Sequence, residues 1–454
     1  MIRVYREQQG VDVSYLLVTL VLAPLAWRIF TDYKRGICWA VFLITALSAN
    51  PVLISGGALP NFNLQRLILI VVLIAAVRTK RLLGPDRNVP FMGTLVVYAV
   101  VNLLPLIFSI DLLVSIKAYL GFTIEIVLFY IIISASFDSR KDARQVMVAG
   151  AAALVTVGIL AIIERYSGLN PVDAFWPDYV RKPEYEFDTL STFPHRILFG
   201  TAMAMGWPLA LAFAQEGNRG RWIWWGCVCI VLLSCYLSFS RGPWVAAMFG
   251  GVLMFLFGGK MVRRQTMVVT FLFSIALLLR PGVWETISVS ASETTDTDSF
   301  KGGTYQYRWE LWAIAWDKIS RSGIRLLFGF GPGTTEIMIF DAVLTYSGET
   351  TELWSWDNHY AATLIESGCA GLAAFAGLYG LFFLKIFRIR GAVDPQDKTL
   401  HAAIMAAITA MLFMMTNVAM FAPQLNYLLW ALIAAGLRLG ANDLREEPYD
   451  SAVA

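Results

Sequence analysis

The chain has 454 residues, of which 57% are hydrophobic and 15% charged, and its formal net charge at pH 7 is +3. Soluble domains carry about a quarter of their residues as charged side chains, so this composition excludes an ordinary soluble fold. The lysines and arginines fall mostly in short loops, which argues against a nucleic-acid-binding protein. The expected solvent of most of the chain is therefore the lipid bilayer.

Apolar segments recur along nearly the whole sequence, and most approach the roughly 20 residues that a helix needs to cross a hydrocarbon layer. They predict an all-α, polytopic transmembrane helical bundle of about 12–13 spans, with residues 1–454 forming a single membrane domain. The expected spans are residues 13–31, 37–55, 63–78, 91–109, 113–135, 145–166, 196–214, 222–239, 243–258, 266–280, 359–387, 398–418 and 421–438.

Basic clusters fall in alternate loops, as the preference of lysine and arginine for cytoplasmic loops requires. The clusters are Lys34-Arg35, Arg78 to Arg87, Arg140 to Arg144, Arg219 to Arg221, Lys260 to Arg264 and Lys385 to Arg390. The intervening loops are expected on the outer side. Two of them are long: residues 167–195 form an outer loop, and residues 281–358 form a large periplasmic loop that we expect to carry short amphipathic helices.

Three arginines flank spans or lie in a long loop on the expected outer side: Arg196, Arg241 and Arg308. Such arginines either extend to lipid phosphates or pair with carboxylates, or they bind an anionic ligand through charge-assisted hydrogen bonds. Their outer position runs against the usual distribution of positive charge, which favours the ligand-binding interpretation.

Aromatic residues recur at helical spacing in the large loop, where Trp309, Trp312, Trp316 and Ile319 share one stripe. The stripe predicts a helix that lies at the membrane interface, with tryptophans at the level of the lipid headgroups. Trp309 and Trp312 are candidates for stacking on sugar rings. Downstream, Gly329 to Gly333 is a glycine-rich segment that we interpret as a tight turn.

The segment Trp354 to Tyr360 combines a carboxylate, an amide and an imidazole immediately before an apolar span. Asp357 or His359 could act as a general base, and Asp357 or Asn358 could instead cap the helix that follows. His195, just before Arg196, also lies on the expected outer side. The Asp-x-Asp sequence at Asp296 to Asp298 has no histidine nearby, so no metal site and no cofactor are expected.

These segments resemble the O-antigen ligase/polymerase superfamily over most of the chain. The resemblance rests on Ser240-Arg241-Gly242, on Arg308 to Trp312, on the glycine-rich turn, and on Asp357-Asn358-His359-Tyr360 followed by Glu366-Ser367-Gly368-Cys369-Ala370-Gly371. The family commonly has histidine directly before the asparagine. Here aspartate occupies that position and the histidine stands two places later. The segment Phe193 to Arg196 is also similar to exopolysaccharide polymerases of the group.

The resemblance implies a GT-C-like, metal-independent, inverting glycosyltransferase in the bacterial inner membrane with its active face toward the periplasm. The donor would be a glycan on undecaprenyl diphosphate, and the acceptor a glycan on a lipid-linked repeat unit or on lipid A core. Arg241 and Arg308, with Arg196 third, would hold the diphosphate, and Asp357 or His359 would be the base. His195, Asn358, Tyr360, Trp309 and Trp312 would contact substrate.

Besides a protein-glycosylating member of the same family, three functions remain open from the sequence. A polymerase of O-antigen or exopolysaccharide repeat units is the first, and an O-antigen ligase that transfers glycan to lipid A core is the second. The third, from another class, is a flippase or transporter of lipid-linked oligosaccharides, although the unusual residues lie on one face and no internal repeat is present. Polysaccharide-assembly proteins are possible partners of either enzyme.

Overall fold

The structure is a computed structural model, and its helices occupy every expected span. It describes residues 11–48, 53, 60–82, 89–170, 189–215, 220–279, 311–338, 340–343, 350–353, 356–389, 395–419 and 422–440. Six of the described helices are long and apolar enough to cross a membrane, by length and composition. The protein is therefore an all-α, multi-pass helical membrane protein, as the sequence predicts.

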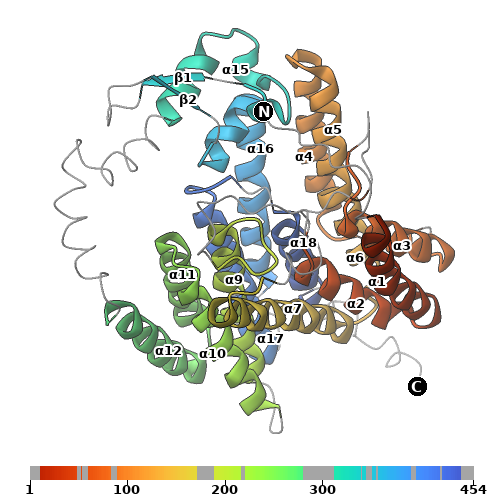
Figure 1. The fold of residues 1–454 in the computed structure, drawn as a ribbon, viewed down its shortest axis with the longest axis vertical. Coiled ribbons are helices and arrows are strands. Elements are labelled where there is room, and N and C mark those ends of the chain that lie inside the picture. Colours follow the sequence, from red (N-terminus) through yellow and green to blue (C-terminus); the bar gives the residue numbers. More distant parts are fainter. Residues whose placement is uncertain are drawn as a thin grey trace, which may run out of the picture.

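Among the helices before residue 168, α1 to α6 lie on the right-hand side of Figure 1, and α7 crosses its lower middle. These are α1 (Val11–Thr31), α2 (Tyr33–Ala46), α3 (Leu64–Arg78), α4 (Met92–Leu103), the 3-10 turn η1 (Leu104–Phe108), α5 (Leu112–Phe122), the π-helical η2 (Thr123–Leu128), α6 (Phe129–Ala135) and α7 (Arg140–Ser167). The segment expected to span residues 37–55 is shorter than predicted, because α2 ends at Ala46.

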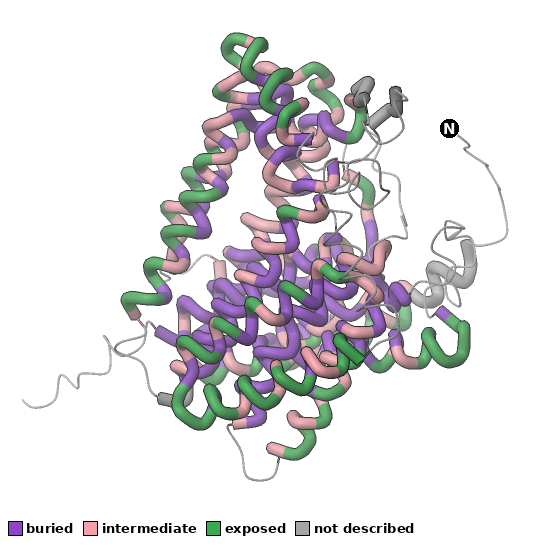
Figure 2. Tube along the Cα trace, turned by 90° about the vertical axis from the view of Figure 1, so that its left-hand side faces the viewer, coloured by how far each residue is buried: buried purple, intermediate pink, exposed green. Residues whose placement is uncertain are grey.

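The rest of the described chain, from residue 196, supplies the most deeply buried helices, α9, α17 and α18, and further helical elements. These elements are α9 (Arg196–Ala214), α10 (Arg221–Leu237), α11 (Arg241–Phe257), α12 (Lys260–Leu278), α15 (Arg325–Phe328), η4 (Thr334–Glu336), α16 (His359–Ile389), α17 (Pro395–Met414) and α18 (Pro423–Leu439). In the apolar part of helix α9, 94% of the residues are buried. Figure 2 shows the buried turns concentrated in the middle of the molecule. Exposed Trp27, Trp222 and Phe271 lie outside this core, as lipid-facing side chains do.

A short antiparallel hairpin, which the all-α prediction does not include, lies at the top of Figure 1 beside α15. Strand β1 (Phe340–Val343) pairs with β2 (Thr350–Leu353), with Phe340 opposite Leu353. In the same part of the chain, residues 311–320 are helical. Their buried face consists of Leu311, Ala315 and Ile319. The buried face shares Ile319 with the expected stripe, whereas Trp316 of the stripe is 56% exposed.

Ion pairs join the loops at one end of the bundle, which we call the basic end (residues 32–35, 78–82, 136–144, 397–398 and 438–440). Lys34 Nζ lies 3.1 Å from Asp138 Oδ2 and 2.8 Å from Asp142 Oδ2, and Arg81 Nη1 lies 2.5 Å from Asp138 Oδ1. Arg438 Nη2 donates to the Asp138 carbonyl at 2.9 Å. The alternation of basic clusters along the sequence thus corresponds to loops that meet in space.

Lowering the pH should weaken the ion pairs at the basic end. Burial favours the neutral form of Asp138, but hydrogen bonds from Arg81 and Lys34 outweigh it and hold the pKa of this carboxyl below its usual value of about 3.9. A lowered pKa in the folded state contributes stability above the unfolded value, which is lost as the pH falls through the folded value. We expect the thermal midpoint of purified protein to drop on titration from about pH 6 to pH 3.

In the Asp138→Asn variant this drop should be smaller than in the wild type. Asp317→Asn is the matched control: Asp317 Oδ1 lies 2.5 Å from Arg321 Nη2, but both side chains are exposed, and exposed ion pairs contribute little to stability. If the thermal midpoint falls equally steeply with pH in Asp138→Asn and in the wild type, the ion pairs of Asp138 do not cause the acid sensitivity.

Candidate functional site

At the end of the bundle opposite the basic end, α9 begins with two of the predicted site residues. His195 is the N-cap of α9: its backbone is extended and its Nδ1 accepts a hydrogen bond from the Ile197 N–H at 3.2 Å. Arg196 follows as the first residue of the helix and is half-buried. The N-cap bond occupies His195 Nδ1 and fixes the orientation of this ring.

The turn between α10 and α11 brings Arg241 to the same place. A Cβ built on Gly200 of α9 would lie 2.7 Å from Pro243 Cγ, so the first turns of α9 and α11 are in direct contact. Trp244 Nε1 donates to the Cys235 carbonyl at 2.9 Å and holds the turn in shape. Arg241 is exposed at the first position of α11, where the free backbone N–H groups of a helix also favour an anion.

The start of α16 is fastened to the end of α17. The Asn358 side chain caps α16, because its Oδ1 accepts from the Tyr360 and Ala361 N–H groups at 3.0 Å each. The His359 N–H donates to the Met415 carbonyl at 2.8 Å, and Tyr360 Oη donates to the Leu412 carbonyl at 2.8 Å. Of the two capping residues that the sequence allows, Asn358 takes the role, while Asp357 is half-buried beside it.

The end of α17 connects this helix start to the turn between α10 and α11 (residues 238–241), which we call the arginine turn. A Cβ on Gly242 would lie 2.9 Å from Met414 Cε, and the next residue, Met415, accepts the hydrogen bond from His359. Gly242, next to Arg241, and His359 therefore both contact the end of α17. Since the first turns of α9 and α11 are also in contact, the starts of α9, α11 and α16 form one cluster at this end of the bundle. These helix starts carry His195, Arg196, Arg241, Asp357 and His359, which are separated by up to 164 residues in the sequence (359 − 195).

A polar cavity of about 370 Å³ adjoins this cluster. Its lining includes His359 from the cluster and also Met415, but not Arg196, Arg241 or Asp357. Ionisable side chains that line it are Arg66, Lys117, Glu125, Glu336, His359 and Glu366. The volume is at the lower end of the range for small-molecule sites.

The imidazole of His359 is packed against an aromatic ring, and one of its nitrogens is buried. Its ring packs edge-on against Phe375, with centroids 5.8 Å apart. Its Nδ1 is buried and has no hydrogen-bond partner among the residues that the structure describes. A buried ring nitrogen without a partner costs free energy and is a frequent property of catalytic groups.

The glycine-rich segment Gly329 to Gly333 is a turn, as expected, and it fills a break in α16. The backbone of Gly368 is non-helical, with φ +65° and ψ −168°, so α16 is interrupted there. The Phe330 N–H donates to the Ile365 carbonyl at 2.8 Å, and the Gly331 N–H to the Glu366 carbonyl at 3.0 Å. The Glu366 carboxylate accepts from Thr335 Oγ1, so the turn also orients a carboxylate that lines the cavity.

Substituting Gly329 by alanine should disrupt this contact. A Cβ at Gly329 would lie 2.3 Å from the Glu366 carbonyl oxygen, and φ at this residue is +74°, which disfavours any side chain. Strain of this kind costs about 1–3 kcal/mol before the clash is counted. We expect a lower thermal midpoint for Gly329→Ala in detergent. Gly377→Ala, with no atom within 4 Å of its Cβ, should leave the midpoint unchanged or raise it; equal midpoints for the two variants would contradict the contact.

The remaining predicted residues of the large loop divide into two groups. Arg308 and Trp309 lie outside the described residues. Trp312 is half-buried and packs against a small cluster that includes Leu311, Phe330 and Trp356. Trp312 does not line the polar cavity.

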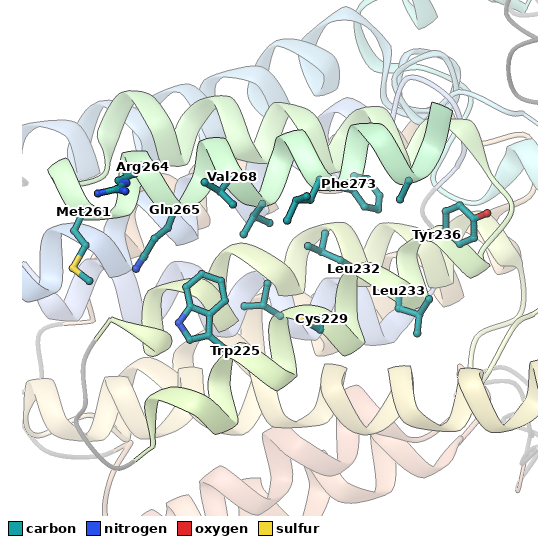
Figure 3. Close-up of a pocket in the computed structure, with 14 residues that line it drawn as sticks. Trp225, Cys229, Leu232, Leu233, Tyr236, Met261, Arg264, Gln265, Val268 and Phe273 are labelled. Carbon is teal, nitrogen blue, oxygen red and sulfur yellow. The ribbon is translucent and has the colours of Figure 1, made fainter. Parts of the chain in front are cut away.

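A second, apolar groove lies between α10 and α12 (Figure 3) and has a volume of about 760 Å³. Trp225, Leu232 and Tyr236 line it from α10, and Val268 and Phe273 from α12. Tyr236 stacks on Trp244, at a centroid distance of 6.1 Å, so this end of the groove lies near the arginine turn. The apolar lining suits a hydrocarbon chain and has few polar groups that could take part in catalysis.

Three of the charged residues that line the cavity, Arg66, Lys117 and Glu125, lie within apolar segments and are not among the site residues that the sequence predicts, whereas Glu366 belongs to the motif after Tyr360. Ionisable residues inside a span are costly and mark functional sites, so this rule could have identified the three. In the described part of the chain, no group of three His, Cys, Asp or Glu side chains is placed to hold a metal ion.

Comparison with known proteins identifies one region. Residues 226–376 match the family model described as O-antigen ligase. The matched range contains Arg241, Arg308, Asp357, His359 and the glycine-rich turn, and excludes His195 and Arg196. A search of the curated proteins finds no match.

Proposed function

Since residues 226–376 match the family model described as O-antigen ligase, we propose that the protein is a membrane glycosyltransferase of the O-antigen ligase/polymerase superfamily that polymerises repeat units of an O-antigen or exopolysaccharide. It would transfer a glycan from undecaprenyl diphosphate to an acceptor glycan. The proposal places the enzyme in the bacterial inner membrane with the arginine turn facing the periplasm, because the opposite end of the bundle carries the basic loops.

The observation that carries the proposal is the meeting of three helix starts, those of α9, α11 and α16, around the end of α17. Each start brings one or two groups with the required chemistry: Arg196, Arg241 and His359. Two of the three segments lie within the matched domain. A polar cavity and an apolar groove adjoin the cluster, which suits a substrate with a glycan and a lipid part.

The leaving group of such a transfer is a diphosphate, on which negative charge grows as the glycosidic bond breaks. Arg241 at the start of α11 and Arg196 at the start of α9 would stabilise this charge, with the helix N-terminus of α11 adding to the effect. Fixed guanidinium groups can supply this stabilisation without a divalent ion. Arg308, outside the described residues, is proposed as a third contact.

The acceptor hydroxyl must lose its proton as its oxygen attacks the anomeric carbon. We assign the base to His359, because its imidazole lines the cavity and Asp357 does not. The new bond forms between the acceptor oxygen and the anomeric carbon, the bond from that carbon to the phosphate oxygen breaks, and undecaprenyl diphosphate leaves. An in-line displacement of this kind inverts the anomeric centre.

The polar atoms of Asn358 and Tyr360 are already bonded to the backbone of α16 and α17, so their proposed role is to hold His359 in place. The isoprenoid tail of the donor would lie in the apolar groove between α10 and α12, which ends near the arginine turn. Figure 3 shows that this groove is lined almost wholly by apolar side chains.

The proposal is tested by purified protein in nanodiscs, supplied with undecaprenyl-diphosphate-linked repeat units in the presence of EDTA. Formation of longer lipid-linked glycans supports a metal-independent polymerase. Product that forms only after lipid A core is added would instead identify a ligase. If neither product forms, and labelled donor moves between the leaflets of proteoliposomes, the protein is a transporter and the proposed function is wrong.

A further inference from the structure

The polar cavity has a wall that comes from the first third of the chain, outside the matched domain. Arg66 on α3, Lys117 on α5 and Glu125 in η2 line the same cavity as His359. Figure 1 shows α3 and α5 on the side of the molecule built by the first half of the chain. The catalytic steps proposed above use none of these three residues.

Arg66 and Glu125 form an ion pair whose side chains are only 17% and 12% exposed. The Arg66 Nε and Nη2 groups both donate to Glu125 Oε1, at 3.1 and 2.7 Å. Within the described part of the chain, Glu125 Oε2 accepts no hydrogen bond. Burying two charges costs more than their attraction returns unless all their polar atoms are satisfied. The second carboxylate oxygen is therefore left available for a ligand in the cavity.

Two features of the local backbone hold this pair at the cavity wall. Residues Thr123–Leu128 are π-helical, an arrangement that is rare and concentrated at functional sites. Gly121 allows the guanidinium to approach the backbone, since a Cβ there would lie 3.2 Å from Arg66 Nη2. The backbone thus departs from a regular helix next to the residue that faces the cavity.

Lys117 and several aromatic rings complete this part of the cavity. Lys117 is half-buried and forms no ion pair with any described residue. Tyr98, Phe122 and Trp430 also line the cavity. Rings that pack on C–H groups, combined with a carboxylate, a guanidinium and an ammonium that bond hydroxyls, are the chemistry that recognises a sugar.

We propose that Arg66, Lys117 and Glu125 form the binding site for the terminal sugar of the acceptor glycan. This inference rests on the proposed function and names the part of the substrate that the cavity takes. Since His359 lines the same cavity, a sugar bound to Glu125 Oε2 and Lys117 would place its hydroxyl groups near the proposed base. The N-terminal third of the chain would then select the acceptor, and the matched domain would hold the leaving group.

The test measures acceptor binding separately from transfer. Lipid-free repeat-unit oligosaccharide is titrated into wild type, Glu125→Gln and Lys117→Gln in detergent by calorimetry, and the KM values for donor and acceptor are measured in the transfer assay. We expect the oligosaccharide Kd and the acceptor KM to rise by about tenfold in both variants, since each loses a hydrogen bond to a charged group. The donor KM should stay unchanged.

Lys34→Gln is the matched control, because it removes a lysine at the basic end, and it should bind oligosaccharide like the wild type. If Glu125→Gln does not fold, Lys117→Gln decides, since Lys117 forms no ion pair with any described residue and its loss should disturb the fold less. Wild-type affinity in a folded variant, or a rise in the donor KM instead of the acceptor KM, would overturn the inference. Oligosaccharide binding that weakens in the variants supports it even if wild type transfers nothing, in which case only the proposed function fails.

Discussion

Replacing Arg241 by alanine should lower the rate of glycan transfer by about 10²–10³-fold, the usual cost of losing one preorganised donor to a developing oxyanion. The physical reason is its position. Arg241 is exposed at the first residue of α11, and Gly242 and Pro243 pack the turn against α17 and α9. The side chain is therefore presented by a rigid turn. The measurement is the initial rate of transfer with saturating acceptor and varied donor.

Arg241→Lys should fall between the wild type and the alanine variant, because lysine keeps the charge and loses the bidentate geometry. Arg35→Ala serves as the control: its side chain is 70% exposed at the basic end and pairs with Asp32 at 3.3 Å. An alanine variant at position 241 that transfers at the wild-type rate would remove Arg241 from the diphosphate site, and Arg196 and Arg308 would then be tested in turn.

Replacing His359 by glutamine should lower kcat by about 10²–10⁴-fold, the range expected for losing a general base. Glutamine keeps a polar group of similar length and preserves the backbone bond from residue 359 to the Met415 carbonyl, but it cannot accept a proton at neutral pH. The acceptor and donor KM values should change little, because the effect lies on the chemical step. The assay is single-turnover transfer with donor and acceptor bound.

Two variants make this result specific. Asp357→Asn should retain most of the activity if His359 is the base, whereas a large loss in Asp357→Asn together with an active His359→Gln would assign the base to Asp357. His401→Gln controls for the loss of a histidine: His401 is buried at the basic end of the bundle, and its Nε2 bonds the Gly436 carbonyl at 2.9 Å. Thermal midpoints of all three variants separate a loss of chemistry from a loss of fold.

The sequence by itself determined the spans, the alternation of loops and the two ends of the bundle. These follow from local properties, since hydropathy over about 20 residues and the charge of short loops depend only on neighbours in the chain. The same reasoning proposes Arg196, Arg241 and His359 as site residues, because they stand at helix starts next to short turns. The structure has a helix at residues 311–320 within the expected loop helix, but only the structure shows that Leu311 and Ala315 join Ile319 on its buried face.

Only the tertiary structure decided which residues share a cavity. The pairing of Arg66 with Glu125 spans 59 residues, and Gln424 Nε2 donates to the Leu47 carbonyl across 377 residues. No local pattern encodes such contacts, because they depend on which helix faces pack together. The break of α16 at Gly368 is likewise stable only because a turn some 40 residues earlier in the chain (368 − 329) supplies backbone N–H groups to its free carbonyls.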